Sequence, residues 1–294
     1  MISIHEFKAE YPHKIDFLDL DLLICHTIKK EREFVLAHPE YKLSVKQELR
    51  IKNYVQRRLK NEPLAYILGE KEFYGLNFKV TPHTLIPRPE TELMVELALE
   101  EIRDAQYSIL NTVDIGTGSG NIITSLVHQL KKTSYKLRAT SYFAIDISKE
   151  ALKIAKQNAK HHNTYKEIKF LHGNLLDPIL KSEIINHKSS LLILANLPYL
   201  SKEIYNACND NVKKYEPKSA LYSDNCGLAH YDQLLNQILK LKNNCSMLHV
   251  SCFMEISPEQ KKLLPPFVSK YFPKAKIEFK KDLAQKWRIC KIII

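Results

Sequence analysis

Apolar residues in the first 72 positions recur at spacings of three and four. The clearest runs are residues 17–28 and 49–59. This spacing gathers apolar side chains on one face of a helix. Glycine, which weakens a helix interior, first occurs at Gly69. The pattern therefore predicts a helical N-terminal domain over residues 1–72.

The pattern changes to strand-like alternation over residues 72–80, around Gly75. Alternation on both sides of a turn glycine predicts a β-hairpin. Residues 84–86 are predicted to form another short strand, and nearby prolines stiffen the connection that follows. We expect residues 73–89 to act as a hairpin linker between the helical domain and a second domain, residues 90–294.

From residue 109 onward, short apolar runs alternate with helical patterns. Helices are predicted at residues 121–130 and 149–162, and strands at residues 109–114, 142–146, 168–171, 191–195, 247–256 and 288–294. Strands that alternate with helices indicate a mostly parallel sheet covered on both faces. The predicted fold class is α/β, with a doubly wound, mostly parallel sheet and a small N-terminal helical domain joined by a β-hairpin.

Composition narrows the class of protein. Of 294 residues, 45% are hydrophobic, which is enough for a packed core. The longest apolar run is too short for a membrane span, and the N-terminus lacks a signal-peptide pattern. Six scattered cysteines without a Cys-x-x-Cys pair predict reduced thiols and no metal site. We therefore expect a cytoplasmic protein.

The formal net charge of +11 raises the question of nucleic-acid binding. Lysine and arginine are dispersed along the chain, with only short clusters such as Lys29-Lys30 and Arg57-Arg58. Such dispersal favours a solvated basic surface. An acidic or RNA-bound partner remains the alternative interpretation of the charge.

A glycine-rich segment follows the first predicted strand of the second domain. It reads Gly116-Thr117-Gly118-Ser119-Gly120 and holds three of the seven glycines in the chain. Glycine lets the backbone turn sharply and approach a ligand closely. The turn also presents the N-terminus of the next helix. This pattern predicts a cofactor loop, although dinucleotide-dependent dehydrogenases use a related one.

Two further positions follow predicted strands. Asp146 ends the strand at residues 142–146, where a carboxylate can accept hydrogen bonds from both ribose hydroxyls. Leu175 follows the strand at residues 168–171 and would form an apolar wall beside an adenine ring. Ligands of open α/β sheets bind at the carboxyl ends of strands, so both positions fit an adenosine cofactor.

The segment Asn196-Leu197-Pro198-Tyr199 follows a buried apolar strand. An amide nitrogen is a poor nucleophile, but Asn196 Oδ1 and the Leu197 carbonyl could accept hydrogen bonds from its two N–H groups. Pro198 restricts the residue before it to extended conformations, and Tyr199 could stack on a planar group. The segment indicates methyl transfer to a planar nitrogen, with Asn196, Pro198 and Tyr199 as catalytic candidates.

These motifs resemble the class I S-adenosylmethionine-dependent methyltransferases, and among them the amino-methyltransferases with an Asn-Pro-Pro-Tyr signature. Further segments are similar to the peptide chain release factor N5-glutamine methyltransferase family. They are EPLAYILGEKEFYG (62–75), LIPRPETE (85–92), YEPKSAL (215–221), EISPEQ (255–260) and KDLA (281–284). The resemblance covers nearly the whole chain and is loosest in the first fifty residues.

The resemblance implies a Rossmann-like catalytic domain and a substrate-recognition role for the N-terminal helices. It implies S-adenosyl-L-methionine as cofactor, with residues 116–120 holding its methionine part, Asp146 its ribose and Leu175 its adenine. Residues 196–199 would hold the substrate, with Asn196 also near the cofactor. That substrate would be the glutamine of the Gly-Gly-Gln motif in class I peptide chain release factors, whose methylation modulates translation termination.

Two residues depart from the family pattern. Leu197 stands where proline is common, but the required acceptor is a backbone carbonyl, which leucine also provides. Asn174 stands where an acidic residue is common, which leaves its role in cofactor binding open.

Other functions fit parts of the sequence. A nucleic-acid adenine-N6 or cytosine-N4 methyltransferase would share the tetrapeptide, but usually carries a target-recognition domain and needs a base-flipping pocket. A dehydrogenase would leave Asn196 to Tyr199 unexplained, and an RNA-binding protein would explain only the charge. We expect a monomeric protein methyltransferase with no membrane association and no direct nucleic-acid substrate.

Overall fold

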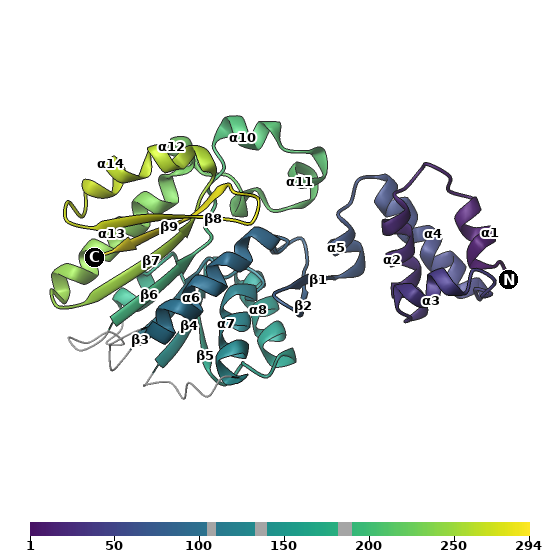
Figure 1. Cartoon of the computed structure of the whole chain (residues 1–294), viewed down its shortest axis with the longest axis horizontal. Coiled ribbons are helices and arrows are strands. Elements are labelled where there is room, and N and C mark those ends of the chain that lie inside the picture. The colour runs from purple at the N-terminus through teal and green to yellow at the C-terminus, as the bar shows by residue number, and fades with distance from the viewer. Residues whose placement is uncertain (105–109, 133–139, 182–189) are drawn as a thin grey trace. The chain divides into compact units, whose positions relative to one another are not determined.

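The structure is a computed structural model that describes residues 1–104, 110–132, 140–181 and 190–294. These residues form two compact units, drawn in Figure 1. One comprises Met1–Glu70 and Asn209–Tyr215, and the other comprises Lys71–Cys208 and Glu216–Ile294. The units thus divide between Glu70 and Lys71, two residues before the expected end of the helical domain. The expected linker lies within the second unit.

The first unit is helical, as the apolar spacing predicts. Its helices are α1 (Ile4–Ala9), α2 (Phe17–Ile28), α3 (Arg32–Ala37), α4 (Val45–Leu59), α5 (Leu64–Leu68) and α11 (Asp210–Tyr215). The faces of α1, α2 and α4 bury a common apolar core that includes Phe7, Leu23 and Ile51. This burial stabilises helices that are too short to be stable alone.

The ends of these helices are set by local sequence. Ser44 begins α4 with a capping box, in which its hydroxyl accepts from Gln47 N and the Gln47 side chain accepts from Ser44 N. Such an exchange satisfies two backbone donors that the first turn leaves unpaired. Although α11 lies far along the chain, it belongs to this unit, and the Tyr215 hydroxyl donates to the Lys60 carbonyl at 2.9 Å.

The second unit contains a mostly parallel sheet, which confirms the predicted fold class. Within the described ranges its strands are β3 (Leu110–Ile115), β4 (Thr140–Asp146), β5 (Ile168–His172), β6 (Ser190–Ala195), β7 (His249–Glu255), β8 (Lys276–Lys281) and β9 (Trp287–Ile293). Their order is β5-β4-β3-β6-β7-β9-β8, with β3 to β7 parallel and the last two pairings antiparallel. The predicted C-terminal strand is confirmed as β9.

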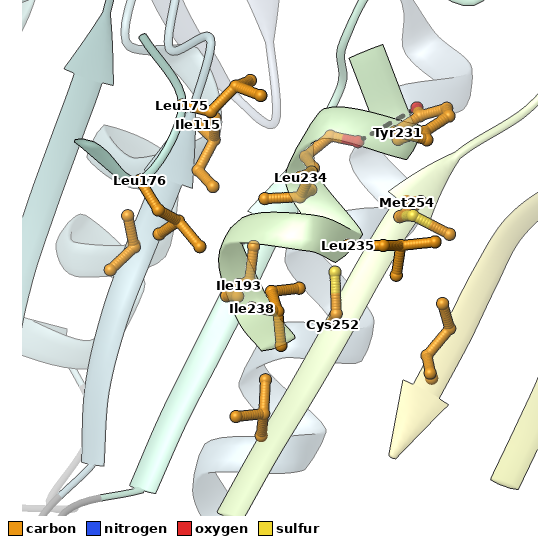
Figure 2. Packing of buried hydrophobic residues seen from close by; sticks show 14 of the residues in the cluster. Ile115, Leu175, Leu176, Ile193, Tyr231, Leu234, Leu235, Ile238, Cys252 and Met254 are labelled. Carbon is orange, nitrogen blue, oxygen red and sulfur yellow. Dashed lines mark hydrogen bonds between the residues drawn. The ribbon is translucent and has the colours of Figure 1, made fainter. Parts of the chain in front are cut away.

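Helices cover both faces of this sheet. They include α6 (Glu92–Asp104), α7 (Asn121–Lys132), α8 (Lys149–His161), α13 (Ala229–Asn244) and α14 (Leu264–Ser269). Alternate residues of β6 point to opposite faces: Leu192 and Leu194 pack with α6 and α7, whereas Ile193 packs with α13. Figure 2 shows this second face, where Ile193 and the β7 residues Cys252 and Met254 lie under α13.

Shorter elements connect these layers. They are α9 (Asp177–Leu180), α10 (Lys202–Ala207), α12 (Asp224–Gly227) and the 3₁₀ helices η1 (Pro89–Thr91), η2 (Lys218–Ala220) and η3 (Pro258–Lys262). Within the ranges given above, none of the helices is both long enough and apolar enough to cross a membrane.

The predicted hairpin forms as β1 (Glu70–Phe73) and β2 (Leu76–Lys79). Phe73 and Phe78 are buried in the same cluster as α6 and α7. Asn158 of α8 accepts from Lys79 N at 2.8 Å and donates to the Lys79 and Ser119 carbonyls at 3.0 and 2.8 Å. The hairpin is therefore attached to the helices of the second unit and, through Asn158, to the glycine-rich loop.

The strand predicted at residues 84–86 is wrong. Thr84 lies in a turn in which its N–H donates to the Thr81 carbonyl at 2.9 Å. The prolines at positions 82 and 87 lack the N–H groups that a strand would donate.

The edge hairpin of β8 and β9 carries the single tryptophan of the chain, Trp287. Its half-buried ring has the Lys261 Nζ 3.5 Å and the Lys281 Nζ 4.9 Å from its centroid. Both ammonium groups are within the range of cation–π attraction. Trp287 thus helps to fix η3 against the edge of the sheet.

Candidate active site

A cavity of about 300 Å³ opens in the second unit at the carboxyl ends of β3, β4, β5 and β6. Its lining includes residues 116–119, 146–148, 173–175 and 196–198, each group following one of these strands. Further lining residues come from the segments before α6 and around η2, and from α7, α8 and α13. The size is that of a small-molecule site, and the position is where open α/β sheets bind ligands.

The glycine-rich loop forms one wall. Gly116, Gly118 and Gly120 all have positive φ, at 68°, 55° and 77°. A Cβ on Gly116 would lie 3.0 Å from Leu197 Cδ2, and one on Gly120 would lie 3.0 Å from Ala155 Cβ. Other residues would be strained and crowded there. The loop therefore needs glycine both for its turn and for its contact with the tetrapeptide.

Asp114 lies behind this loop and is fully buried. Its Oδ2 accepts from the Thr117 hydroxyl at 2.6 Å, while Oδ1 has no hydrogen-bond partner in the part of the chain that the structure describes. Burial raises the pKa of Asp114 to about 7, against the opposing effect of the Thr117 hydrogen bond. The site thus keeps an acidic group with unused acceptor capacity behind the loop.

Asp146 faces the cavity from the end of β4. Its Oδ2 accepts from Gly118 N and its Oδ1 from Ser148 N, both at 2.8 Å. A carboxylate has about four lone-pair positions, so each oxygen can accept another hydrogen bond. Burial raises the pKa of Asp146, and the two backbone N–H groups oppose this effect. The side chain is fixed with acceptors available for a diol.

Leu175 forms another wall and has a φ of +51°, a conformation that is strained for leucine. Gln237 of α13 holds the adjoining backbone: its Oε1 accepts from Leu176 N at 2.7 Å and its Nε2 donates to Asp177 Oδ1 at 2.9 Å. Asn174 also lines the cavity. Gln237 therefore supports the wall that the sequence assigned to adenine.

The tetrapeptide follows β6 and lines the cavity beside the glycine loop, in a part that we call the amide end. Asn196, Leu197 and Pro198 line it, and Asn196 Nδ2 donates to Thr91 Oγ1 at 3.2 Å. The Leu197 side chain is only 4% exposed and packs against Gly116, which explains how leucine is accommodated in place of proline. Three of the four tetrapeptide residues thus line the same cavity as the glycine-rich loop.

Tyr199 has a different environment. It is absent from the cavity lining, and its hydroxyl donates to Glu255 Oε1 at 3.0 Å. Burial is the main cause that raises the pKa of Tyr199 well above its usual value, with the Glu255 charge adding to it. Glu255 thus fixes the hydroxyl end of Tyr199, and the stacking of its ring on a substrate amide stays a prediction.

Glu255 ends β7 and is 1% exposed. It accepts from Tyr199 and, through Oε2, from the Thr91 hydroxyl at 2.7 Å. Burial raises the pKa of Glu255, while Thr91, Tyr199 and the charge of Arg288 oppose the shift. The sequence signal for this residue is a carboxylate at the end of a buried strand, in the segment EISPEQ (255–260) that resembles the family.

An ion pair connects two segments at the rim. Arg88 Nη2 and Glu216 Oε1 are 2.5 Å apart, and Glu216 Oε2 accepts from Ile86 N at 3.2 Å. Glu216 is buried, so this pair fixes the segment before α6 beside the one leading into η2. His230 also lines the cavity, and burial lowers its pKa, which favours the neutral imidazole.

Comparisons with known proteins agree with this geometry. Residues 6–69 match the family model described as the PrmC N-terminal domain, and residues 107–271 match a methyltransferase domain. The chain is 35% identical over 249 residues to the release factor glutamine methyltransferase of Enterococcus faecalis, covering 85% of this chain and 82% of that protein. It is 34% identical over 277 residues to the Bacillus subtilis protein of the same name, covering 93% and 90%.

Among solved structures, the hMettl16 catalytic domain in complex with MAT2A 3'UTR hairpin 1 has a similar fold. Its TM-score is 0.53, its sequence identity is 16%, and the match covers 92% of this chain and 90% of that chain. This likeness concerns the fold alone. The two-part family match, the similarity over most of the chain and the arrangement of the cavity lead to one conclusion: the chain belongs to the release factor glutamine methyltransferase family.

Proposed function

We propose that this protein methylates the side-chain amide nitrogen of the glutamine in the Gly-Gly-Gln motif of class I peptide chain release factors, and so modulates translation termination. One observation carries the proposal. A single cavity brings together Asp146, the glycine loop and, beside that loop, the Asn196 carboxamide, in a chain of this family.

The cofactor of this enzyme is S-adenosyl-L-methionine, which when bound supplies a methyl group carried on a positively charged sulfur. The residues fit it. Residues 116–120 would hold its methionine part, where glycine permits close approach. Asp146 would bind its ribose through the remaining acceptor positions, and Leu175 would contact its adenine.

At the amide end, the protein would hold the substrate amide rather than supply acid–base groups. Asn196 Oδ1 and the Leu197 carbonyl would each accept one N–H of the glutamine amide, while Pro198 keeps Leu197 extended. The nitrogen lone pair would then be directed toward the methyl group. As the new N–C bond forms, the bond between that carbon and sulfur would break to leave a neutral thioether, and the nitrogen would release one proton to water. The main contribution is positioning of the two reactants.

A glutamine side chain offers little surface for discrimination, so we assign recognition of the release factor to contacts outside the cavity, with a substrate-recognition role for the N-terminal helical unit. We further propose a monomer that acts in the cytoplasm and has no nucleic-acid substrate. Recognition outside the cavity predicts that an intact release factor is methylated at far lower concentration than a short Gly-Gly-Gln peptide. Equal KM values for the two would contradict it.

The direct test is incubation of the purified protein with radiolabelled S-adenosylmethionine and either a release factor or DNA. Label is expected on the motif glutamine of the release factor, located by peptide mass spectrometry. A release factor with glutamate at that position is the matched control and should stay unlabelled. Label in DNA instead would favour the adenine-N6 or cytosine-N4 alternative.

A further inference from the structure

Four side chains from three separate parts of the chain form a connected series behind the amide end of the cavity. Asn196 Nδ2 donates to Thr91 Oγ1 at 3.2 Å, Thr91 Oγ1 donates to Glu255 Oε2 at 2.7 Å, and the Tyr199 hydroxyl donates to Glu255 Oε1 at 3.0 Å. Thr91 and Glu255 are each 1% exposed. We call this series the Asn196 relay.

The direction of each hydrogen bond follows from the number of protons available. An ionised carboxylate only accepts, and each hydroxyl has one proton to donate. Thr91 gives its proton to Glu255, so toward Asn196 its oxygen can act only as an acceptor. The group of Asn196 that meets Thr91 must then be the amino group, Nδ2. Asn196 Oδ1 has no donor bonded to it among the residues that the structure describes.

We propose that Thr91 and Glu255 are positioning residues that fix the orientation of the Asn196 carboxamide, so that Oδ1 rather than Nδ2 is presented to the substrate. This inference rests on the proposed function. Thr91 lines the cavity beside Asn196, but its role is exerted through Asn196. Glu255 has no place in the lining and acts through Thr91.

This orientation has a chemical consequence for substrate choice. A primary amide presents two N–H donors at its nitrogen, and these need acceptors. The opposite orientation of Asn196 would place one NH₂ group against another and leave donors unpaired in a partly buried site. A glutamate side chain has only acceptors when ionised, so the fixed Oδ1 also disfavours it. The relay thus selects an amide over a carboxylate.

Replacing Thr91 tests the relay. Thr91→Val keeps the shape of the side chain but removes its acceptor, which frees the carboxamide to rotate. We expect kcat to fall about ten- to a hundredfold, as for other losses of alignment, with unchanged KM for the release factor and unchanged Kd for S-adenosylmethionine. Thr91→Ser keeps the hydroxyl and should retain most of the turnover.

Thr112→Val is the matched control. Thr112 is a buried threonine of β3 whose hydroxyl has no hydrogen-bond partner in the described ranges. This variant should therefore keep the wild-type kcat. In an Asn196→Ala background, Thr91→Val should have no further effect on kcat, because the residue that it orients is gone. Should Thr91→Val fail to fold, Thr91→Cys gives the same contrast, since a thiol is a weak acceptor.

Three results would overturn the relay: wild-type turnover in Thr91→Val, a serine variant as slow as the valine variant, or additive losses in the Asn196→Ala background. Failure of the proposed function gives a different result. In that case the wild-type protein binds S-adenosylmethionine in calorimetry but leaves the release factor unlabelled. Each variant is compared only after its circular dichroism spectrum and thermal unfolding match those of a folded protein.

Discussion

Two parts of the cavity are fixed by different kinds of group: the cofactor end, at the carboxyl ends of β3 and β4, and the amide end, at the carboxyl end of β6. At the cofactor end, the glycine loop and Asp146 are fixed mainly by backbone: Gly118 N and Ser148 N bind the carboxylate. At the amide end, Asn196 is fixed by side chains. Thr91 lies 105 residues from Asn196 in the sequence, and Glu255 lies 164 residues from Thr91. The cofactor end thus depends on backbone N–H groups at most 28 residues from Asp146, whereas the amide end depends on side chains much farther apart in the sequence.

The sharpest way to test the amide end is Asn196→Ala. Its Oδ1 acts when the nitrogen is being methylated, so kcat should fall by about 10²–10³, the usual loss for one preorganised hydrogen-bonding group at a reacting centre. Binding of the release factor, measured by calorimetry, should change little. Turnover at the wild-type rate would remove Asn196 from the mechanism.

Asp146→Asn tests the cofactor end. It removes the charge that would assist the ribose hydrogen bonds, so the affinity for S-adenosylmethionine should fall by about 1.5–3 kcal/mol, measured by calorimetry. Asparagine has one acceptor oxygen where Asp146 has two, so either Gly118 N or Ser148 N loses its partner. The free energy of unfolding of the apo protein should therefore fall by about 1–3 kcal/mol, although burial disfavours the ionised form of Asp146. An unchanged Kd would exclude Asp146 from the cofactor site.

Asp114, behind the glycine loop, makes the free energy of unfolding depend on pH. Its pKa of about 7 in the folded protein lies above the ordinary value of 3.8, so between these values the folded state holds the proton more tightly. This contribution to stability is complete below pH 4 and is lost as the pH rises toward 7, by at most about 1.4 kcal/mol per pH unit. Asp114→Asn should lack that slope when urea unfolding of the two proteins is compared across this range. Parallel curves would contradict the assignment.

The smallest effect is expected for Leu197→Pro. This change restores the residue common in the family and keeps the backbone carbonyl, so kcat should stay within a few-fold of wild type. It also removes a buried side chain that packs against Gly116, which should lower the free energy of unfolding by about 1–3 kcal/mol. Complete loss of activity in a folded variant would mean that the leucine side chain itself takes part in the site.

The comparison explains what the sequence could reveal. The glycine loop, Asp146, Leu175 and Asn196 each stand at or just after the end of an apolar strand. Their meeting at one edge of the sheet could therefore be predicted, because parallel strands bring their carboxyl ends to the same edge. Thr91 and Gln237 do not follow a strand, since they lie in η1 and α13. Their roles depend on which side chain stands opposite them after folding, and no local pattern carries that information.

The errors have similar physical causes. The strand expected at residues 84–86 fails because flanking prolines remove backbone donors. Strand β8 was not predicted, although Ile277 and Phe279 alternate with charged residues as an edge strand requires.

The lysine-flanked Trp287 provides an optical distinction between the two compact units. It is the single tryptophan among 294 residues and lies in the catalytic unit, whereas the fifteen tyrosines are spread over both units. Fluorescence excited selectively at the indole therefore follows the melting of the catalytic unit alone, while the far-ultraviolet helical signal follows both. Coincident curves from the two probes would show that the whole chain unfolds as one cooperative body.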